Sequence, residues 1–277
     1  MKMGLLTKNR KVFIWCLFDW ANSPYPTVIL TFVFSAYFTK LVAEDEISGT
    51  FLWSQTIAFS GLFMAVIAPI LGAISDETGK KKIWILVFSI LAILATMNLW
   101  FVLPDKKSVP LALIAIAISL IAFEFCTIFY NATLIQVANS SSIGKVSGLG
   151  WAAGYIGAII CLLICLFGLV EGSFSFLRLD IDQSEHIRAT TIVVGLWWFI
   201  FSLPFFIFFK EEKRATRFSG NHILKGLIRL FTTIKNIKHY RPIMLFLLAR
   251  IFYADGLLVV FEFGGIYAAG AFRMTFS

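Results

Sequence analysis

Charged residues are scarce in this chain of 277 residues. Asp, Glu, Lys and Arg make up 14% of it, whereas a soluble domain contains about 25%. Hydrophobic residues make up 59%, aromatic residues 16%, and the mean hydropathy is +0.85. A soluble fold of this size cannot bury so much apolar surface, because chain length limits the fraction that folding buries. The composition therefore excludes a soluble globular protein and indicates an integral membrane protein.

Histidine and cysteine are also few. The three histidines, His186, His222 and His239, lie in polar connectors and form no cluster. The four cysteines lie in apolar runs, and Cys161 and Cys165 have no His or further Cys nearby to complete a metal site. We interpret the cysteines as packing residues. Since no nucleophile, base and metal ligands are clustered, we expect neither an enzyme nor a bound cofactor or metal.

Seven segments are apolar and close to the length of about 20 residues that a membrane-spanning helix needs. They cover residues 12–38, 52–74, 83–103, 111–136, 147–170, 190–209 and 242–269. The first has no small-residue cleavage site after a short apolar core, so we interpret it as a retained span. The sequence predicts an all-α, polytopic fold. It comprises a six-helix bundle over 1–209, a basic connector over 210–241, and the first helix of a second bundle over 242–277.

Lys and Arg are concentrated in alternate connectors. The N-terminal segment, residues 80–82 and the connector 210–241 are rich in them, and the connectors between are poorer. Because cytoplasmic loops carry excess Lys and Arg, we expect a cytoplasmic N-terminus. The low-charge, Ile- and Phe-rich composition favours a bacterial inner membrane. The net charge of +8 then reflects topology and contact with anionic lipid, and nucleic-acid binding is not expected.

The basic connector also contains a periodic segment. Residues 222–240 place apolar side chains on one helical face and basic ones, Lys225, Arg229, Lys235 and Lys238, largely around the other. This pattern predicts an amphipathic helix on the inner membrane surface. A partner site of the calmodulin-target kind is the alternative.

A motif rich in glycine and lysine joins the second and third expected spans. It reads Gly72-x-x-x-Asp76-x-x-Gly79-Lys80-Lys81-Lys82. We expect Gly72 to allow close helix packing, Asp76 to lie at a helix N-terminus, and Gly79 to permit a tight reversal. The lysines would hold the loop at the anionic face of the membrane. An ordinary positively charged inner loop is the alternative.

This motif resembles the signature loop of the major facilitator superfamily. Four further stretches are similar, in order, to landmarks of the bacterial branch related to the fungal autophagy-linked vacuolar amino-acid effluxers. They are FDWANSPYPTVILTFVFSAYF, IFYNATL, KVSGLGWAAGYIG and RIFYADGLLVVFEFGGIYAAGAF. One departure is Leu134-Ile135-Gln136, where that branch usually has Leu-Pro and an acidic residue. The resemblance implies two related helical halves, so we expect this chain to be a C-terminally truncated piece of such a carrier.

Charged and polar residues within the expected spans are the candidates for binding. Charges in a membrane are costly and usually face a cavity or a partner. The resemblance implies that the first, fourth and seventh spans line a central cavity, and the charges fall on these spans. The candidate substrate- or ion-binding residues are Asp19, Asn22, Glu124, Asn131, Arg250, Asp255 and Glu262.

Two prolines follow the first of these acids. Pro24 and Pro26 each lack a backbone N–H, so we expect the first span to kink or break there. The freed carbonyls and the Asn22 amide would then face water or substrate beside a cavity. A packing kink with Asp19 hydrogen-bonded inside the bundle is the alternative.

Two further helix faces carry a pattern. Asp255 and Glu262 share a face of the seventh span, whereas Arg250 is poorly placed to pair with Asp255. Two acids on one face predict a proton or cation site, or partners for basic groups elsewhere. The glycines of SGLGWAAGYIG lie inside the fifth span and lack the spacing of a nucleotide-binding loop. We interpret them as a packing face.

The predicted function is that of a secondary transporter, an alternating-access carrier for a small solute that is coupled to protons or a cation. The resemblance favours amino acids as substrate, although a fold alone does not define one. Asp19 and Asn22 would bind substrate or cation. Glu124, Asp255 and Glu262 would supply protonation or countercharge, and residues 72–82 would control the inner gate. The alternative is a non-transporting receptor or remnant derived from a transporter fold.

Overall fold

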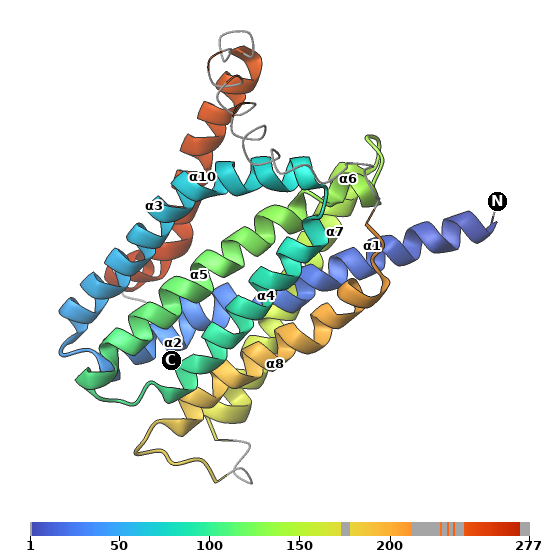
Figure 1. Ribbon diagram of the computed structural model, residues 1–277. Coiled ribbons are helices and arrows are strands. Elements are labelled where there is room, and N and C mark those ends of the chain that lie inside the picture. The colour runs from blue at the N-terminus through green and yellow to red at the C-terminus, as the bar shows by residue number, and fades with distance from the viewer. Residues whose placement is uncertain are drawn as a thin grey trace. The chain divides into compact units, whose positions relative to one another are not determined.

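The computed structural model describes the backbone of residues 2–172, 178–211, 228, 232, 235 and 241–271. It describes the side chains of the same residues except 2–8, 76–78 and 257–271. The chain divides into two units, residues 1–223 and 224–277. The secondary structure of the described residues is helical throughout (Figure 1), as expected from the sequence.

Six helical segments among the described residues are long and apolar enough to cross a membrane. They are Asn9–Val42, Glu46–Ser75, Lys81–Phe101, Lys106–Val137, Ile143–Val170 and Glu185–Phe208. These correspond to the first six expected spans and confirm the polytopic helical fold. In the second unit, α10 (Arg241–Ala271) is one helix over the expected seventh span. The expected amphipathic helix at 222–240 lies outside the described residues, apart from Ile228, Thr232 and Lys235.

The first span changes its helical type at the two prolines. The regular helix α1 (Lys2–Asn22) is followed by the π-helix η1 (Tyr25–Phe32), the short α2 (Phe34–Tyr37) and the π-helix η2 (Phe38–Val42). The amide of Val33 donates to the carbonyl of Val28 at 2.9 Å, which is the five-residue spacing of a π turn. The span is therefore distorted after Asn22, while its backbone remains helical.

Each remaining span is built around one main helix. The next spans are α3 (Glu46–Thr78), α4 (Lys81–Asn98) with η3 (Leu99–Phe101), and η4 (Lys106–Ser108) with α5 (Val109–Asn131) and α6 (Leu134–Val137). These are followed by α7 (Ile143–Leu163) with η5 (Ile164–Val170), and α8 (Glu185–Phe208). Helix α3 contains Pro69 and bends along its length (Figure 1).

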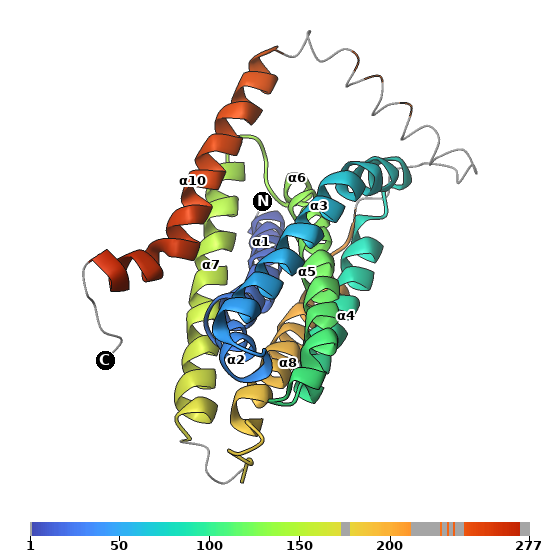
Figure 2. The same ribbon diagram turned by 90° about the vertical axis from the view of Figure 1, so that its left-hand side faces the viewer.

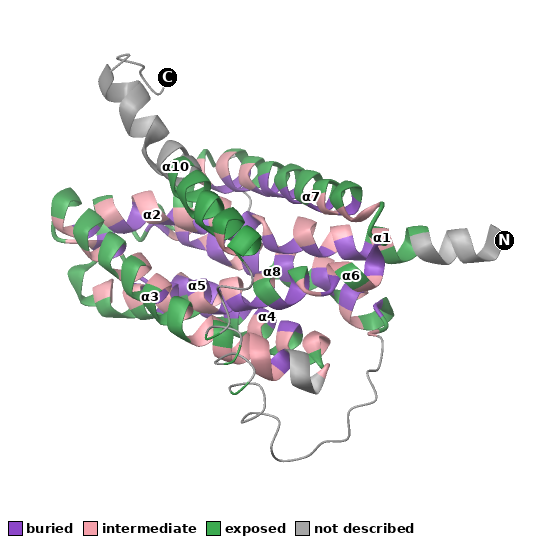
Figure 3. Cartoon of the chain, turned by 90° about the horizontal axis from the view of Figure 1, so that it is seen from above, coloured by how far each residue is buried: buried purple, intermediate pink, exposed green. Residues whose placement is uncertain are grey.

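The first unit is held together by the neighbouring pair α4 and α5 and by several helix pairs that are distant in sequence. Helix α1 packs against α7 and α8, α4 packs against α5 and α8, and α3 packs against α5. The neighbouring helices α4 and α5 lie side by side in both ribbon views (Figures 1 and 2). Seen from above, the buried positions of α1, α4, α5 and α8 lie toward one another (Figure 3). Residues of the first span are thereby brought next to residues more than 100 positions later.

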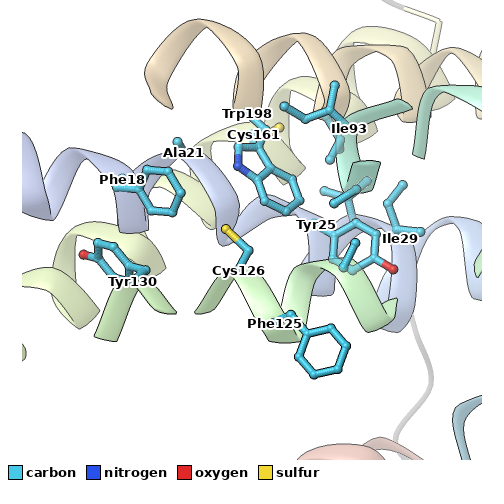
Figure 4. Packing of buried hydrophobic residues seen from close by; sticks show 14 of the residues in the cluster. Phe18, Ala21, Tyr25, Ile29, Ile93, Phe125, Cys126, Tyr130, Cys161 and Trp198 are labelled. Atoms are coloured by element: carbon cyan, nitrogen blue, oxygen red, sulfur yellow. The ribbon is translucent and has the colours of Figure 1, made fainter. Parts of the chain in front are cut away.

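Large aromatic side chains fill the interior of this unit. Phe18, Tyr25, Tyr130 and Trp198 are fully buried. Figure 4 shows these side chains together with the buried Cys126, whose sulfur lies 3.2 Å from Oγ of Ser89. Because lipid is as apolar as these side chains, close packing and hydrogen bonds between helices stabilise such a bundle more than removal from water does.

Candidate functional site

Asp19 lies on α1 one helical turn after Trp15, where α1 faces α7. A Cβ atom placed on Gly150 of α7 would lie 2.5 Å from Oδ2 of Asp19 and 2.6 Å from Cζ3 of Trp15. The carboxylate also lies close to the hydroxyl of Tyr130 on α5. Within the described part of the chain it forms no ion pair. Asp19 is thus a carboxylate at a three-helix junction without a basic partner among those residues.

Tyr130 fixes the geometry of this junction. Its hydroxyl donates to the backbone carbonyl of Trp15 at 2.8 Å, and its ring stacks on the Trp15 indole with centroids 4.5 Å apart. The indole nitrogen of Trp15 donates to Oγ1 of Thr133 at 3.1 Å, and that hydroxyl donates to the Tyr130 carbonyl at 2.7 Å. All three side chains are buried. They hold α1 against the end of α5 and present the Tyr130 hydroxyl to Asp19.

Glu124 is the second acid within the spans of this unit. It lies on α5 six residues before Tyr130, which corresponds to roughly 9 Å along the helix. Its carboxylate is close enough to the Tyr25 hydroxyl to interact electrostatically, and that hydroxyl bonds to Oγ of Ser119 at 2.7 Å. Among the described residues Glu124 has no hydrogen-bond or ion-pair partner. The two acids therefore lie at different depths along the α1–α5 pair.

The two asparagines among the candidates differ in their environment. Asn22 is the last residue of α1 and is 3% exposed, so it belongs to the interior near Asp19. Asn131 is the last residue of α5 and is exposed. The preceding residue, Tyr130, makes the buried polar contact of this segment, because its hydroxyl donates to the Trp15 carbonyl.

One carbonyl freed by the prolines is not available to a substrate. In a regular helix the N–H of residue 24 would bond to the carbonyl of Trp20, but Pro24 has no N–H. The indole nitrogen of Trp197 on α8 donates to that carbonyl at 3.1 Å. The same oxygen would lie 2.7 Å from a Cβ on Gly157 of α7. The expectation that the freed carbonyls face water is therefore wrong for Trp20, whose carbonyl serves helix packing.

The loop motif before α4 differs from expectation at two of its positions. Asp76 lies in the last turn of α3, so the expectation that it occupies a helix N-terminus is wrong. A Cβ on Gly72 would meet no atom within 4 Å, so the described residues do not provide the close packing expected there. Gly79 ends α3 with φ 63° and ψ 14°, a left-handed conformation that glycine adopts without steric cost.

A different acid lies at the helix N-terminus next to this loop. Glu211, just after α8, accepts a hydrogen bond at 2.6 Å from the amide of Lys81 in the first turn of α4. It also accepts a longer one, 3.4 Å, from the amide of Lys82. Free amides and the helix dipole both favour an anion at this position. Lys80, the N-cap residue of α4, has no side-chain cap bond of its own.

The lysines of the loop bind the ends of two other helices. Nζ of Lys82 donates to the carbonyl of Phe209 at 2.7 Å, where α8 ends. Nζ of Lys81 donates to the carbonyl of Ala132 at 3.5 Å, where α5 ends. Basic side chains are favourable at helix C-termini because the last carbonyls lack partners and the dipole is negative there. Together with Glu211, these lysines join the ends of α4, α5 and α8, which we refer to as the Gly79 end.

Arg188 is a buried cation that the sequence analysis does not single out. It is 4% exposed, and its guanidinium donates to the carbonyl of Trp100 at 2.7 Å and to that of Gln183 at 3.0 Å. Its charge also lies over the Trp100 ring, 5.0 Å from the centroid. Ser184, which precedes α8, has a positive φ of 53°. The left-handed conformation of Ser184 is visible only in the structure. No sequence pattern predicts that Arg188 is buried.

The remaining candidates belong to the second unit. Arg250 and Asp255 lie on α10, as does the backbone of Glu262, whose side chain lies outside the described residues. Within the part of the chain whose side chains are described, no three His, Cys, Asp or Glu side chains are grouped as a metal site would require. The structure thus joins Asp19, Tyr130 and Gly150 into one site, and leaves the role of the α10 acids a prediction.

Two family models match this chain. Residues 3–162 match the model described as Major Facilitator Superfamily, and residues 135–277 match the one described as "Vacuole effluxer Atg22 like". The chain belongs to the Major Facilitator Superfamily and to the Atg22-like family. The resemblance identified from the loop motif and the later landmarks is thereby confirmed.

Several curated proteins are similar to this superfamily member. It is 30% identical over 258 residues to an "Uncharacterized MFS-type transporter YxiO" from Bacillus subtilis, covering 92% of this chain and 59% of the relative. It is 28% identical over 142 residues to "Autophagy-related protein 22-1" from Aspergillus fumigatus, covering 47% of this chain and 22% of the relative. The chain thus spans less than two thirds of the length of these relatives. No solved structure matches it.

The two family models can be compared with the positions of the spans. The six spans of the first unit are those matched by the two models, and Asp19 lies on the first of them. The Asp19 junction is formed by α1, α5 and α7, which are the first, fourth and fifth spans. It therefore lies wholly inside the part of this facilitator that the structure describes.

Proposed function

We propose that this chain is part of a secondary active transporter that moves a small solute across a membrane by alternating access. Amino acids are the favoured substrate class, because of the resemblance to the autophagy-linked effluxers. The proposed orientation has the N-terminus and the Gly79 end on the cytoplasmic side of a bacterial inner membrane. The basic residues of the N-terminal segment and of the Gly79 end support this orientation. We propose no enzymatic reaction for the chain.

The observation that carries this proposal is the Asp19 carboxylate at the junction of α1, α5 and α7. A carboxylate inside a membrane span is costly and is normally retained for a binding or coupling role. Around Asp19 the described residues provide a phenolic hydroxyl and a glycine, and no ion-pair partner. A carboxylate in such a site can bind and release a proton, a monovalent cation or the ammonium group of a substrate.

Glu124 supports the same proposal from a second position. It has no hydrogen-bond or ion-pair partner among the described residues, and it lies on the helix that carries Tyr130. Two acids at different depths along α1 and α5 would allow one to bind substrate while the other carries the coupling ion. The α10 acids, Asp255 and Glu262, are proposed to contribute from the second unit.

Uptake by the reconstituted full-length protein to which this chain belongs tests the proposal. Proteoliposomes would be offered a mixture of labelled amino acids with and without an inward proton gradient. We expect gradient-dependent uptake that Asp19→Asn lowers at least tenfold and Glu124→Gln lowers less. Asp182→Asn, on an exposed turn, is the matched control and should leave uptake unchanged.

Two results would contradict the proposal in different ways. Gradient-dependent uptake that Asp19→Asn does not alter would remove Asp19 from the mechanism and make it a packing residue. Absence of uptake together with absence of substrate binding by a folded protein would favour the non-transporting receptor or remnant.

A further inference from the structure

The glycines of α7 differ in what they contact. A Cβ on Gly150 would lie 2.5 Å from Oδ2 of Asp19, and a Cβ on Gly154 would lie 2.5 Å from Oγ of Ser23. Real Cβ atoms essentially never come closer than 3.0 Å to such neighbours. Gly148, two residues earlier on the same helix, would meet nothing within 4 Å. General helix packing does not explain why two of these glycines face polar side-chain oxygens.

The two contacts are in register along the helices. Ser23 directly follows α1, lies four residues after Asp19, and its amide donates to the Asp19 carbonyl at 3.1 Å as in a helical turn. Gly150 and Gly154 are four residues apart on α7. Residues with this spacing lie on the same face of a helix. Each polar oxygen of the first span therefore occupies the space that a methyl group would fill at the facing position of α7.

The space that the Asp19 carboxylate occupies beside Gly150 is bounded by a side chain that is itself held in place. The indole of Trp15 would lie 2.6 Å from a Cβ on Gly150, and this ring is itself stacked on Tyr130 and bonded to Thr133. The indole therefore cannot move aside easily. A side chain at position 150 would have to displace the more mobile group, which is the Asp19 carboxylate.

We infer that Gly150 is a positioning residue for Asp19: its missing side chain forms the notch on α7 that holds the carboxylate between α1, α5 and α7. A consequence is that any movement of α7 along or around α1 changes the surroundings of this carboxylate. The importance of Gly150 for transport rests on the proposed transport role of Asp19. The position of the Asp19 side chain against Gly150 does not depend on that role.

The test compares Gly150→Ala with the matched control Gly148→Ala, using the full chain in lipid. The first readout is the rate at which a membrane-permeable carbodiimide labels Asp19, followed by mass spectrometry. We expect Gly150→Ala to raise this rate at least threefold, because the carboxylate leaves its notch, and Gly148→Ala to match the wild type. Equal rates in all three proteins, or an equal change in both variants, would overturn the inference.

A second readout is needed where Gly150→Ala lowers the amount of folded protein. The double variant Asp19→Ala/Gly150→Ala removes the displaced side chain. We expect it to recover at least half of the melting-temperature loss of Gly150→Ala, measured relative to Asp19→Ala alone. Full additivity would show that Gly150 serves only Trp15 and would contradict the inference.

Transport measured on the same variants separates this inference from the proposed function. If labelling changes in Gly150→Ala and transport depends on Asp19, we expect the pH profile of uptake to shift in Gly150→Ala only. If labelling changes and the wild type does not transport, Gly150 still positions Asp19, and the transport proposal alone fails.

Discussion

The indole nitrogen of Trp197 donates a hydrogen bond, 3.1 Å long, to the carbonyl oxygen of Trp20. Pro24 leaves this carbonyl without its usual helical donor, and α8 supplies a replacement. The two indole rings also stack, with centroids 5.8 Å apart. The sequence suggests that the two prolines expose backbone carbonyls of the first span. At Pro24 the exposed carbonyl instead forms a hydrogen bond that holds this span against α8.

Replacement of Trp197 by Phe tests this hydrogen bond. The ring contact is largely kept, while the donor is lost. Hydrogen bonds between membrane helices contribute about 0.6 kcal/mol on average and about 1.7 kcal/mol at most, so we expect a loss of stability in this range. Thermal unfolding in detergent would measure it. Trp151→Phe, at a tryptophan that is 61% exposed, should not change the melting temperature.

Replacement of Glu211 by Gln tests the connection at the Gly79 end. The neutral amide accepts more weakly from the first turn of α4 and no longer attracts Lys82. We expect the amides of Lys81 and Lys82 to exchange with deuterium several times faster, with little change in the middle of α4. Glu171→Gln, at an exposed acid, is the control. Unchanged exchange at Lys81 would show that Glu211 does not hold the helix end.

Asp45 makes the start of α3 sensitive to pH. Its carboxylate accepts hydrogen bonds from the amide and hydroxyl of Ser48 and from the amide of Ile47, and these bonds hold its pKa below the usual value. The folded state therefore binds the proton less readily than the unfolded state. The stabilisation is fully present above the unfolded pKa of about 3.9 and is lost as pH falls through the lower folded value.

Melting curves of the wild type and Asp45→Ala across pH would check this sign. We expect the wild type to melt at the higher temperature at pH 7, and the difference between the two proteins to shrink below about pH 4, near the unfolded Asp pKa. A difference that stays constant down to pH 3 would show that the charge of Asp45 does not cap α3.

Replacement of Arg188 by Lys tests the buried cation at the start of α8. An ammonium group keeps the charge but cannot reach both carbonyls and stack on Trp100 at once. Hydrogen bonds to charged groups contribute about 1.5–3 kcal/mol each, so we expect a loss of roughly 2 kcal/mol in the free energy of unfolding. Arg178→Lys, at an exposed position, should have no measurable effect on chemical denaturation.

The spans of this protein could be predicted from the sequence, because length and hydropathy are local properties that the bilayer thickness constrains. The reversal at Gly79 was predictable for a similar reason, since a single residue with positive φ defines it. The identity of the acid at the N-terminus of α4 could not be predicted in this way. Asp76 is near this helix in sequence, but Glu211 arrives there because α8 ends beside α4.

The surroundings of the candidate residues were also beyond sequence patterns. Asp19 could be singled out because a carboxylate in an apolar run is unusual. Its contact with Gly150 depends on the relative rotation of α1 and α7, and small residues along a helix do not specify it. The partner of the Trp20 carbonyl depends on a tryptophan 177 positions later in the chain.

The Gly79 end has a further consequence for the way this protein can change over evolution. Lys81 and Lys82 bind backbone oxygens, and Glu211 binds backbone amides. A main-chain atom is present whatever residue occupies its position, so loss of one of these charges cannot be compensated by a substitution at the contacted site. We therefore expect these three positions to vary independently of the residues whose backbone atoms they bind. Co-variation among relatives would then not reveal that α4, α5 and α8 are joined here.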